Sequence, residues 1–208
     1  MKSLLDFIVK PLGEKYNSEI KIGDKSLITN VDLNNFRAVN NMAEVVEVPL
    51  AFETKIKKGD IIVIHHNVFR TFRDIRGKQK TSRSKFIEDL YFVSVDQIYM
   101  YKSENNWNTF NDRCFVKPIV NNDDLTLDKE NKLVGILKYG NSSLEAIKIT
   151  PGDVVGYVEG CEYEFFIDNE RLYCMKSNDI VIKYEYQGNE IEYNPSWAKS
   201  SWRINQGG

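Results

Sequence analysis

The sequence has few of the residues on which metal sites and covalent catalysis depend. It contains two histidines, His65 and His66, and three cysteines. Adjacent residues on a strand point to opposite faces, so the two histidines are not expected to share a metal site. Neither histidine lies in a Ser-His-Asp context, and no G-x-x-x-x-G-K-[ST] loop is present. We therefore predict a protein that is not an enzyme and that binds no cofactor or metal.

Long apolar runs and paired cysteine spacings are missing too. No apolar stretch approaches the roughly 20 residues that span a bilayer, which argues against a membrane partner. Cys114, Cys161 and Cys174 are odd in number and show no C-x-x-C spacing. Free, mostly buried thiols in a reducing compartment are expected. The start also lacks the long apolar region of a signal peptide. These features predict a cytoplasmic protein.

The sequence also lacks a strong charge of one sign. The net charge is −2 at neutral pH. Residues 1–104 carry 17 Lys and Arg against 14 Asp and Glu, whereas residues 105–208 carry 11 against 16. Neither half has the bulk positive charge that by itself indicates a nucleic-acid-binding protein. The charge therefore disfavours nucleic acid as a partner.

What the sequence does contain is an internal repeat. The phrase LYFVSVDQIYMYK at 90–102 returns 82 residues later as LYCMKSNDIVIKYE at 172–185. Four further pairs of elements recur in the same order, which implies a duplication. They are FIVKPL and CFVKPI (7–12 and 114–119), AEVVEVP and VGILKYG (43–49 and 134–140), IKKGDIIVI and ITPGDVVGY (56–64 and 149–157), and FIE and FID (86–88 and 166–168).

The repeated elements predict an all-β fold with two tandem small β-barrels. The elements are short, rich in Val, Ile, Tyr and Phe, and separated by Gly, Pro, Asn and Asp, as is typical of strands and turns. Continuous aliphatic runs such as Ile61–Ile64 suit strands covered on both faces, and a closed barrel removes exposed sheet edges. We expect barrels at 1–104 and 105–190, followed by a polar tail at 191–208 that contains Trp197 and Trp202.

The ordered elements resemble the GroES co-chaperonin family. AEVVEVP, KKGDIIVI and PGDVVGY are similar to the family's middle strands, and LYCMKSNDIVIKYE is similar to its closing strand, with Met175, Asp179 and Ile180 in place. Copy one departs from the pattern at Gln97, where copy two has Asp179. The tandem arrangement resembles the double co-chaperonins of chloroplasts, and the irregular loops resemble divergent, phage-type members. The fold implied by the resemblance is two GroES-like barrels.

The resemblance implies a mobile loop between the first and second elements, whose apolar tip docks on a chaperonin. In copy one the tip is Ser26, Leu27, Ile28 and Thr29. Around Gly23-Asp24, however, the sequence alternates as a β-hairpin does, so this segment is alternatively an extension of the barrel. Copy two offers a second candidate loop with Leu125 and Leu127, for which a plain solvated loop is favoured.

The stretch from His65 to Phe86 is unusually basic. By the repeat it falls where the family has its roof hairpin, with a turn near Arg76-Gly77-Lys78. A solvated or oligomer-facing hairpin is favoured over contact with an acidic protein, and both are favoured over stacking on single-stranded nucleic acid. The cations that define this basic hairpin are Arg70, Arg73, Arg76, Lys78 and Lys80.

The resemblance implies a function as a co-chaperonin that caps a GroEL-type chaperonin ring and assists ATP-dependent protein folding. ATP would be bound by the chaperonin, and the chain would form a homo-oligomer in the cytoplasm, or in the host cytoplasm if it is phage-encoded. The alternative is a structural or virion assembly protein that has the same barrels without chaperonin docking.

Overall fold

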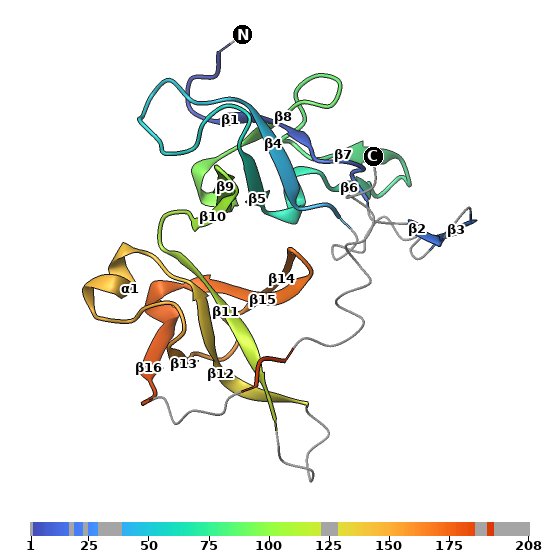
Figure 1. Ribbon diagram of the computed structural model, residues 1–208. Coiled ribbons are helices and arrows are strands. Elements are labelled where there is room, and N and C mark those ends of the chain that lie inside the picture. Colours follow the sequence, from blue (N-terminus) through green and yellow to red (C-terminus); the bar gives the residue numbers. More distant parts are fainter. Residues whose placement is uncertain are drawn as a thin grey trace. The chain divides into compact units, whose positions relative to one another are not determined.

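The computed structural model describes residues 2–16, 19–22, 25–28, 39–121, 129–185 and 191–193, with the backbone alone for 19–22 and 25–28. The chain divides into two compact units, Met1–Asn108 and Thr109–Gly208, each with its own six-stranded antiparallel sheet (Figure 1). Strands dominate both units, and the described residues contain one α-helix. The prediction of an all-β chain is confirmed.

Unit 1 is built on the sheet order β10-β9-β5-β4-β1-β8. Two hairpins, β2–β3 and β6–β7, form separate two-stranded sheets. The bounds are β1 Phe7–Pro11, β2 Glu19–Ile22, β3 Lys25–Ile28, β4 Met42–Glu47, β5 Ile61–Ile64, the 3-10 helix η2 His66–Val68, β6 Thr71–Arg73, β7 Gln79–Thr81, β8 Tyr91–Val93, the 3-10 helix η3 Val95–Gln97, β9 Ile98–Ser103 and β10 Asn106–Thr109.

Unit 2 is built on the sheet order β14-β15-β11-β12-β13-β16. The segment Ile191–Tyr193, at the start of the expected tail, pairs with the end of β11 through the Val120 N–H, which donates to Ile191 O at 2.8 Å. The bounds are β11 Arg113–Val120, β12 Glu130–Tyr139, α1 Ser142–Ala146, β13 Val154–Tyr157, β14 Tyr163–Ile167, β15 Glu170–Lys176, the 3-10 helix η4 Ser177–Asp179 and β16 Ile180–Lys183.

The two sheets share a frame of five strands. The order β9-β5-β4-β1-β8 in unit 1 is the order β16-β13-β12-β11-β15 in unit 2, strand for matched strand. Two register shifts in each sheet fall at matched positions, so the paired residues of the two frames correspond there. The matched shifts fall between Ile8 and Val9 and between Val63 and Ile64 in unit 1, and between Phe115 and Val116 and between Gly156 and Tyr157 in unit 2. A further shift, between Pro118 and Val120, occurs in unit 2 alone among the described ladders. The duplication inferred from the sequence is confirmed at this level.

The Gly-Asp turn before the third frame strand is built alike in both units. Gly59 and Gly152 take φ values of +88° and +98°, which a side chain disfavours. The carboxylate of Asp60 accepts from the Lys57 N–H at 2.8 Å, and that of Asp153 accepts from the Thr150 N–H at 2.7 Å. The turn is therefore closed by the side chain of the residue that follows the glycine.

Gln97 in copy one makes the same capping contact that Asp179 makes in copy two. Gln97 Oε1 accepts from the Ser94 N–H at 3.1 Å, while Asp179 Oδ2 accepts from the Lys176 N–H at 2.9 Å. Both oxygens cap the short 3-10 helix before the last frame strand. An amide and a carboxylate serve equally here because only an acceptor oxygen is needed.

Two details of the sequence interpretation change. The second strands of the two frames, β4 and β12, align with an offset of one residue from the alignment expected from the sequence. Ala43 corresponds to Gly135 and not to Val134. The described ladders form open sheets and not closed barrels. The expectation that aliphatic runs are covered on both faces is confirmed, because Ile62, Val63 and Ile64 are all fully buried.

The paired turns give a test of the shared frame. No atom lies within 4 Å of the position that a Cβ would take at Gly59 or Gly152, so Gly59→Ala and Gly152→Ala change only the backbone energy. We expect each substitution to lower the free energy of unfolding by about 1 kcal/mol, because the positive φ is retained at a steric cost. Denaturant unfolding of the two variants measures this. Unchanged or increased stability in either variant would contradict the shared turn geometry.

Candidate interaction surfaces

The predicted docking tip lies on a paired hairpin. Strands β2 and β3 pair antiparallel, with Ile20 opposite Leu27 and Glu19 opposite Ile28. Ser26, Leu27 and Ile28 belong to β3, whereas Thr29 lies outside the described residues. The hairpin interpretation of this segment is thus confirmed for the backbone. The two strands form a sheet of their own and do not extend the six-stranded sheet of unit 1.

The second candidate loop falls between β11 and β12. Leu125 and Leu127 both lie outside the described residues. The insertion between the first and second frame strands is long in unit 1, from Leu12 to Asn41, and short in unit 2, from Asn121 to Lys129. The two copies therefore differ most at the segment to which the resemblance assigns docking.

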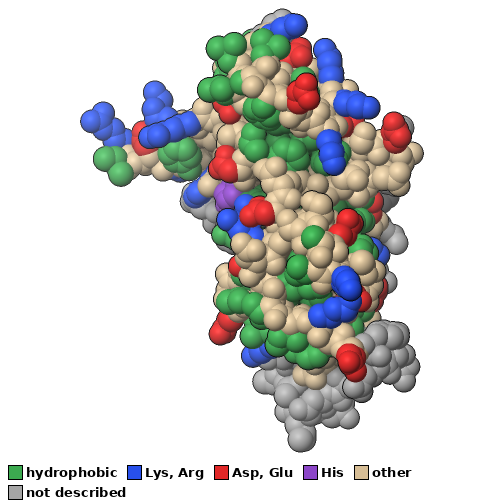
Figure 2. Space-filling view, turned by 90° about the vertical axis from the view of Figure 1, so that its left-hand side faces the viewer, with side chains coloured by type: hydrophobic (Ala, Val, Ile, Leu, Met, Phe, Trp, Pro, Cys, Tyr) green, Lys and Arg blue, Asp and Glu red, His purple; other side chains and the backbone are tan. Residues whose placement is uncertain are grey.

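The basic stretch forms the predicted hairpin, with β6 and β7 joined by a turn at 74–78. The Asp74 carboxylate closes this turn, because Oδ1 accepts from the N–H groups of Arg76 and Lys78, each at 2.9 Å. Gly77, at φ +75°, completes the turn. Figure 2 shows Lys and Arg side chains gathered on an arm that projects at the left of the view. The many cations of this arm match the composition of the hairpin.

The base of the basic hairpin is fastened to unit 1. The Tyr16 hydroxyl donates to Thr71 O at 3.1 Å and accepts from the Thr71 N–H at 2.7 Å. The Ser82 hydroxyl donates to Val68 O at the end of η2. Arg70 lies at this base, and its Nε is buried without a hydrogen-bond partner among the described residues. Arg73, Arg76, Lys78 and Lys80 all lie on the exposed part.

The two histidines lie together, contrary to the expectation of opposite faces. Strand β5 ends at Ile64 and η2 begins at His66, so the alternation of a strand does not apply. The rings stack with centroids 4.3 Å apart, and His65 Nδ1 accepts from the Asn67 N–H at 3.1 Å. Burial, and then the charges of His65 and Arg70, lower the pKa of His66 to about 4. The His66 imidazole is therefore neutral at pH 7.

The three thiols are free, and their surroundings keep them protonated. Cys114 and Cys174 are fully buried and Cys161 is partly buried. Burial, with a smaller contribution from Asp179, raises the pKa of Cys114 to about 12 and that of Cys161 to about 11. Burial also raises the pKa of Cys174. These thiols are core side chains and not nucleophiles, since thiolates carry that reactivity.

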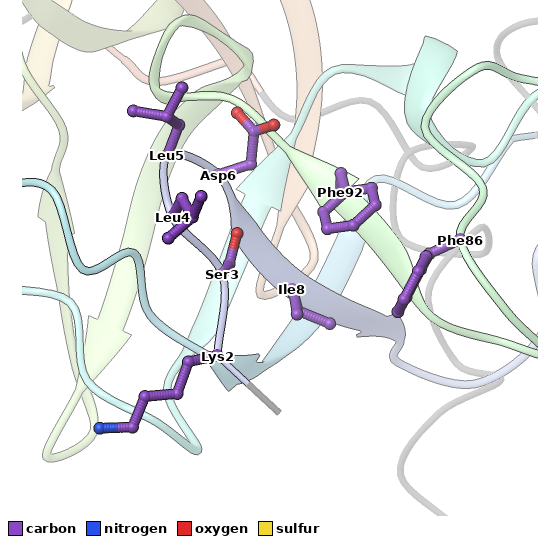
Figure 3. A pocket seen from close by; sticks show the side chains of 8 residues that line it. All are labelled: Lys2, Ser3, Leu4, Leu5, Asp6, Ile8, Phe86 and Phe92. Atoms are coloured by element: carbon purple, nitrogen blue, oxygen red, sulfur yellow. The ribbon is translucent and has the colours of Figure 1, made fainter.

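A shallow apolar groove on unit 1 was not anticipated from the sequence. Its volume is about 350 Å³. Phe86 and Phe92 lie on one side and the segment Lys2–Asp6 on the other, with Ile8 between them (Figure 3). The rings of Phe86 and Phe92 are 4.8 Å apart, and Leu4 is 70% exposed. Scattered leucines and phenylalanines in separate elements leave no periodic signal, so sequence reasoning missed this surface.

The last frame strands differ in cover. In unit 1, β10 pairs with the outer edge of β9, and Tyr99 and Met100 are 4% and 0% exposed. In unit 2, β16 pairs only with β13 among the described strands, and Val181 and Ile182 are 59% and 47% exposed. The β16 edge therefore presents open backbone groups beside exposed apolar side chains, which is the usual setting for pairing with another chain.

A buried ion cluster in unit 2 is structural. The Lys117 side chain is 5% exposed and pairs with Glu170 at 3.1 Å and with Glu192. The hydrogen bonds of these carboxylates help to raise the pKa of Lys117 against the opposing effect of burial. Glu192 belongs to the segment that pairs with β11. The ion pairs thus hold that segment against the sheet.

Comparison with known proteins gives no family assignment. No protein-family model matches the chain, and no curated protein sequence matches it. Within the described ranges, no helix is long and apolar enough to cross a membrane. The described residues also contain no group of three His, Cys, Asp or Glu side chains that could hold a metal ion.

The histidine pair predicts an acid-sensitive stability. Because the pKa of His66 is about 4 in the folded chain and about 6.5 when unfolded, the unfolded state binds a proton more readily. The contribution of neutral His66 to the free energy of unfolding is complete above pH 6.5 and is lost as the pH falls toward 4. We expect a loss of about 1 kcal/mol between pH 7 and pH 5, after allowance for solvent screening. Denaturant midpoints of wild type and His66→Gln at both pH values measure it. An equal pH dependence in both proteins would contradict the assignment.

Proposed function

We propose that the chain is a co-chaperonin, a lid that binds a GroEL-type chaperonin ring and assists ATP-dependent folding. The observation that supports this most is the duplicated five-strand frame together with the hairpin β2–β3, inserted between its first and second strands in copy one. That position is where the resembled family has its docking loop. On this proposal each open sheet is a divergent form of the GroES-like strand frame, and ATP is bound by the chaperonin.

The docking chemistry follows from the sequence of the hairpin. Leu27 and Ile28 supply two adjacent aliphatic side chains. Aliphatic side chains entering an apolar groove gain free energy in proportion to the apolar area removed from water. A hairpin already paired at Glu19–Ile28 loses less conformational freedom on docking than an unpaired loop, which favours binding. In this role Ser26, Leu27, Ile28 and Thr29 form the contact.

A structural or virion assembly protein is the second candidate. The observation in its favour is the same ladder, because β2 and β3 pair along their length as a fixed structural hairpin does. In such a protein the frames would be building blocks, and the hairpin would contact its own assembly. The two candidates differ in one respect that can be measured, namely ATP-dependent binding to a chaperonin.

Both candidates include a homo-oligomer, and the open edge of β16 is the surface that supports it. A strand supplied by a second copy would pair there as β10 pairs with β9 in unit 1. It would cover Val181 and Ile182 as β10 helps to cover Tyr99 and Met100. The first strand β1 has ladder partners on both sides, β4 and β8, so it does not provide this pairing.

Docking is tested by charge in the aliphatic pair. We expect Leu27→Asp and Ile28→Asp each to abolish ATP-dependent binding to a GroEL-type chaperonin, because a carboxylate in an apolar groove is costly. Pull-down and sedimentation with purified chaperonin and ATP measure binding, and circular dichroism checks the fold. The matched control is Leu125→Asp with Leu127→Asp, which should bind as wild type does. Loss of binding in the control alone would transfer docking to the second loop, and a wild-type chain that never binds would favour the assembly protein.

Self-association is tested at the β16 edge. We expect an oligomer at micromolar concentration by sedimentation equilibrium, and a shift toward monomer for Val181→Glu, because a charge at the centre of the edge opposes strand pairing. Ile147→Glu is the control, since Ile147 is 63% exposed in the same unit but lies outside the sheet. A wild-type chain that is strictly monomeric would contradict the proposal.

A further inference from the structure

The hairpin β6–β7 is an addition to the frame and not part of it. In unit 2 the third frame strand β13 is followed by β14 after five residues, 158–162. In unit 1 the matched strand β5 is followed by η2, β6 and β7 before the chain reaches β8. Unit 2 therefore builds the same five-strand frame without such an arm. The stability of the frame does not explain why the arm is present.

The arm is nevertheless firmly built. Its base is held by the two hydrogen bonds between Tyr16 and Thr71, and its turn is held by the Asp74 carboxylate. The strands themselves pair in register, with Phe72 opposite Lys80 and Arg73 opposite Gln79. An exposed hairpin of three-residue strands is marginal by itself, so these fastenings keep its backbone in the extended, paired form. A preformed strand binds with less loss of conformational entropy.

The outer edge of β7 is open. The Asp74 N–H donates to Lys78 O at 2.9 Å, and the Ser82 N–H donates to Arg70 O at 3.0 Å. Antiparallel ladders alternate, so the main-chain groups of Lys78, Lys80 and Ser82 face β6, and those of Gln79 and Thr81 face away. The sheet has two strands among the described residues, which leaves that edge without a ladder partner. The opposite edge is partly taken, because Tyr16 holds Thr71.

Cations lie on both faces of the ribbon beside this edge. Directly opposite residues share a face, so Phe72 and Lys80 lie on one face and Arg73 and Gln79 on the other. Lys78 and Arg76 add two cations at the turn, and Ile75 between the strands is fully exposed. The single acid, Asp74, is already engaged by backbone N–H groups. Arg73, Arg76, Lys78 and Lys80 form no ion pair within the described part of the chain.

We propose that the outer edge of β7, at Gln79–Thr81, takes an extended acidic segment of a partner protein as a third strand of the β6–β7 sheet. An added strand sends alternate side chains to the two faces, so acidic residues on either face meet a cation. The open N–H and C=O groups of Gln79 and Thr81 supply the ladder. Positive charge also repels a second arm, which excludes self-pairing at this edge.

The open ladder edge decides between an acidic peptide and nucleic acid. A phosphate backbone would use the cations but has no regular row of amide groups to pair with β7. A strand uses both. The proposal concerns this arm alone, and it holds or fails whether or not the chain caps a chaperonin.

The test uses the full chain and a fluorescein-labelled 12-residue peptide of alternating Glu and Thr. We expect saturable binding by fluorescence anisotropy that weakens as salt is raised, because the Debye length shortens from about 30 Å at 0.01 M to about 10 Å at 0.1 M. The combined variant Arg73→Gln, Lys78→Gln and Lys80→Gln should bind about tenfold more weakly or worse. The matched control removes three exposed lysines elsewhere in unit 1, Lys55→Gln, Lys57→Gln and Lys58→Gln, and should bind as wild type does.

Two further arms separate strand addition from simple charge attraction. A peptide of the same sequence with every backbone nitrogen methylated keeps its charge and loses the ladder donors of both edges, so it should lose most of its binding. Hydrogen exchange at the amides of Gln79 and Thr81 should slow in the presence of the unmethylated peptide. Equal binding of the methylated peptide would overturn the proposal, as would equal loss in the Lys55, Lys57 and Lys58 control. A single-stranded or duplex 20-mer DNA is the last ligand. If it binds more tightly than the peptide, and the combined variant of Arg73, Lys78 and Lys80 loses that binding, the arm is a nucleic-acid site and the proposal is wrong.

Discussion

The main-chain groups of Val45 in unit 1 and of Leu137 in unit 2 join three parts of each sheet. Val45 lies opposite Val9 of the first strand, and it exchanges hydrogen bonds of 2.8 and 2.9 Å with Gly59 and Asp60 of the Gly-Asp turn. Leu137 lies opposite Val116 and makes the same two bonds with Gly152 and Asp153, at 2.8 and 2.9 Å. Both side chains are also buried, so each of these residues is held by the core of its unit as well as by main-chain bonds. One residue in each unit thus sets the register of the first strand, the second strand and the turn. The register shift of the first strand lies directly beside it, between Ile8 and Val9 in unit 1 and between Phe115 and Val116 in unit 2.

The parts of the frame that could be predicted are those in which one residue type has a unique backbone role or a unique place in the core. A glycine at positive φ followed by a capping aspartate is visible in both copies, and so is the order of the aliphatic strands. The bulges were not visible, because an extra residue in an aliphatic strand does not change its composition. The match of Ala43 to Val134 failed by one residue for the same reason. Neighbouring aliphatic positions differ in which face they occupy, and letter-by-letter comparison does not record the face.

The candidate surfaces were predictable to the extent that they are local. Alternation around Gly23-Asp24 and the turn residues near Gly77 indicate hairpins, and both hairpins are present. Surfaces made by elements far apart in the chain were not predictable, such as the groove between Leu4 and Phe86. The histidine pair failed differently, because the strand was assumed to continue through His66, whereas a 3-10 helix begins there. What docks on Leu27 and Ile28 is not in the sequence at all, since a docking free energy belongs to two surfaces and this chain supplies one of them.

The two copies agree in the frame and differ in what is added to it. Copy one has β10 beside its last frame strand and two hairpins, whereas copy two has the short helix α1. The strand β14 is not an addition, because residues 84–86 of copy one bond to Leu90 and Phe92 in the matched place. Each addition is absent from a unit that forms the frame without it, so none of them is required for the five strands to pair. The addition that covers a sheet edge, β10, helps to bury apolar side chains of β9 and stabilises its own unit. The hairpins β2–β3 and β6–β7 stand apart from the six-stranded sheets, and the exposed residues of β6–β7 gain no such burial. The packing of the frame therefore does not constrain their sequences. Contact with another molecule would give their apolar and cationic side chains a defined partner.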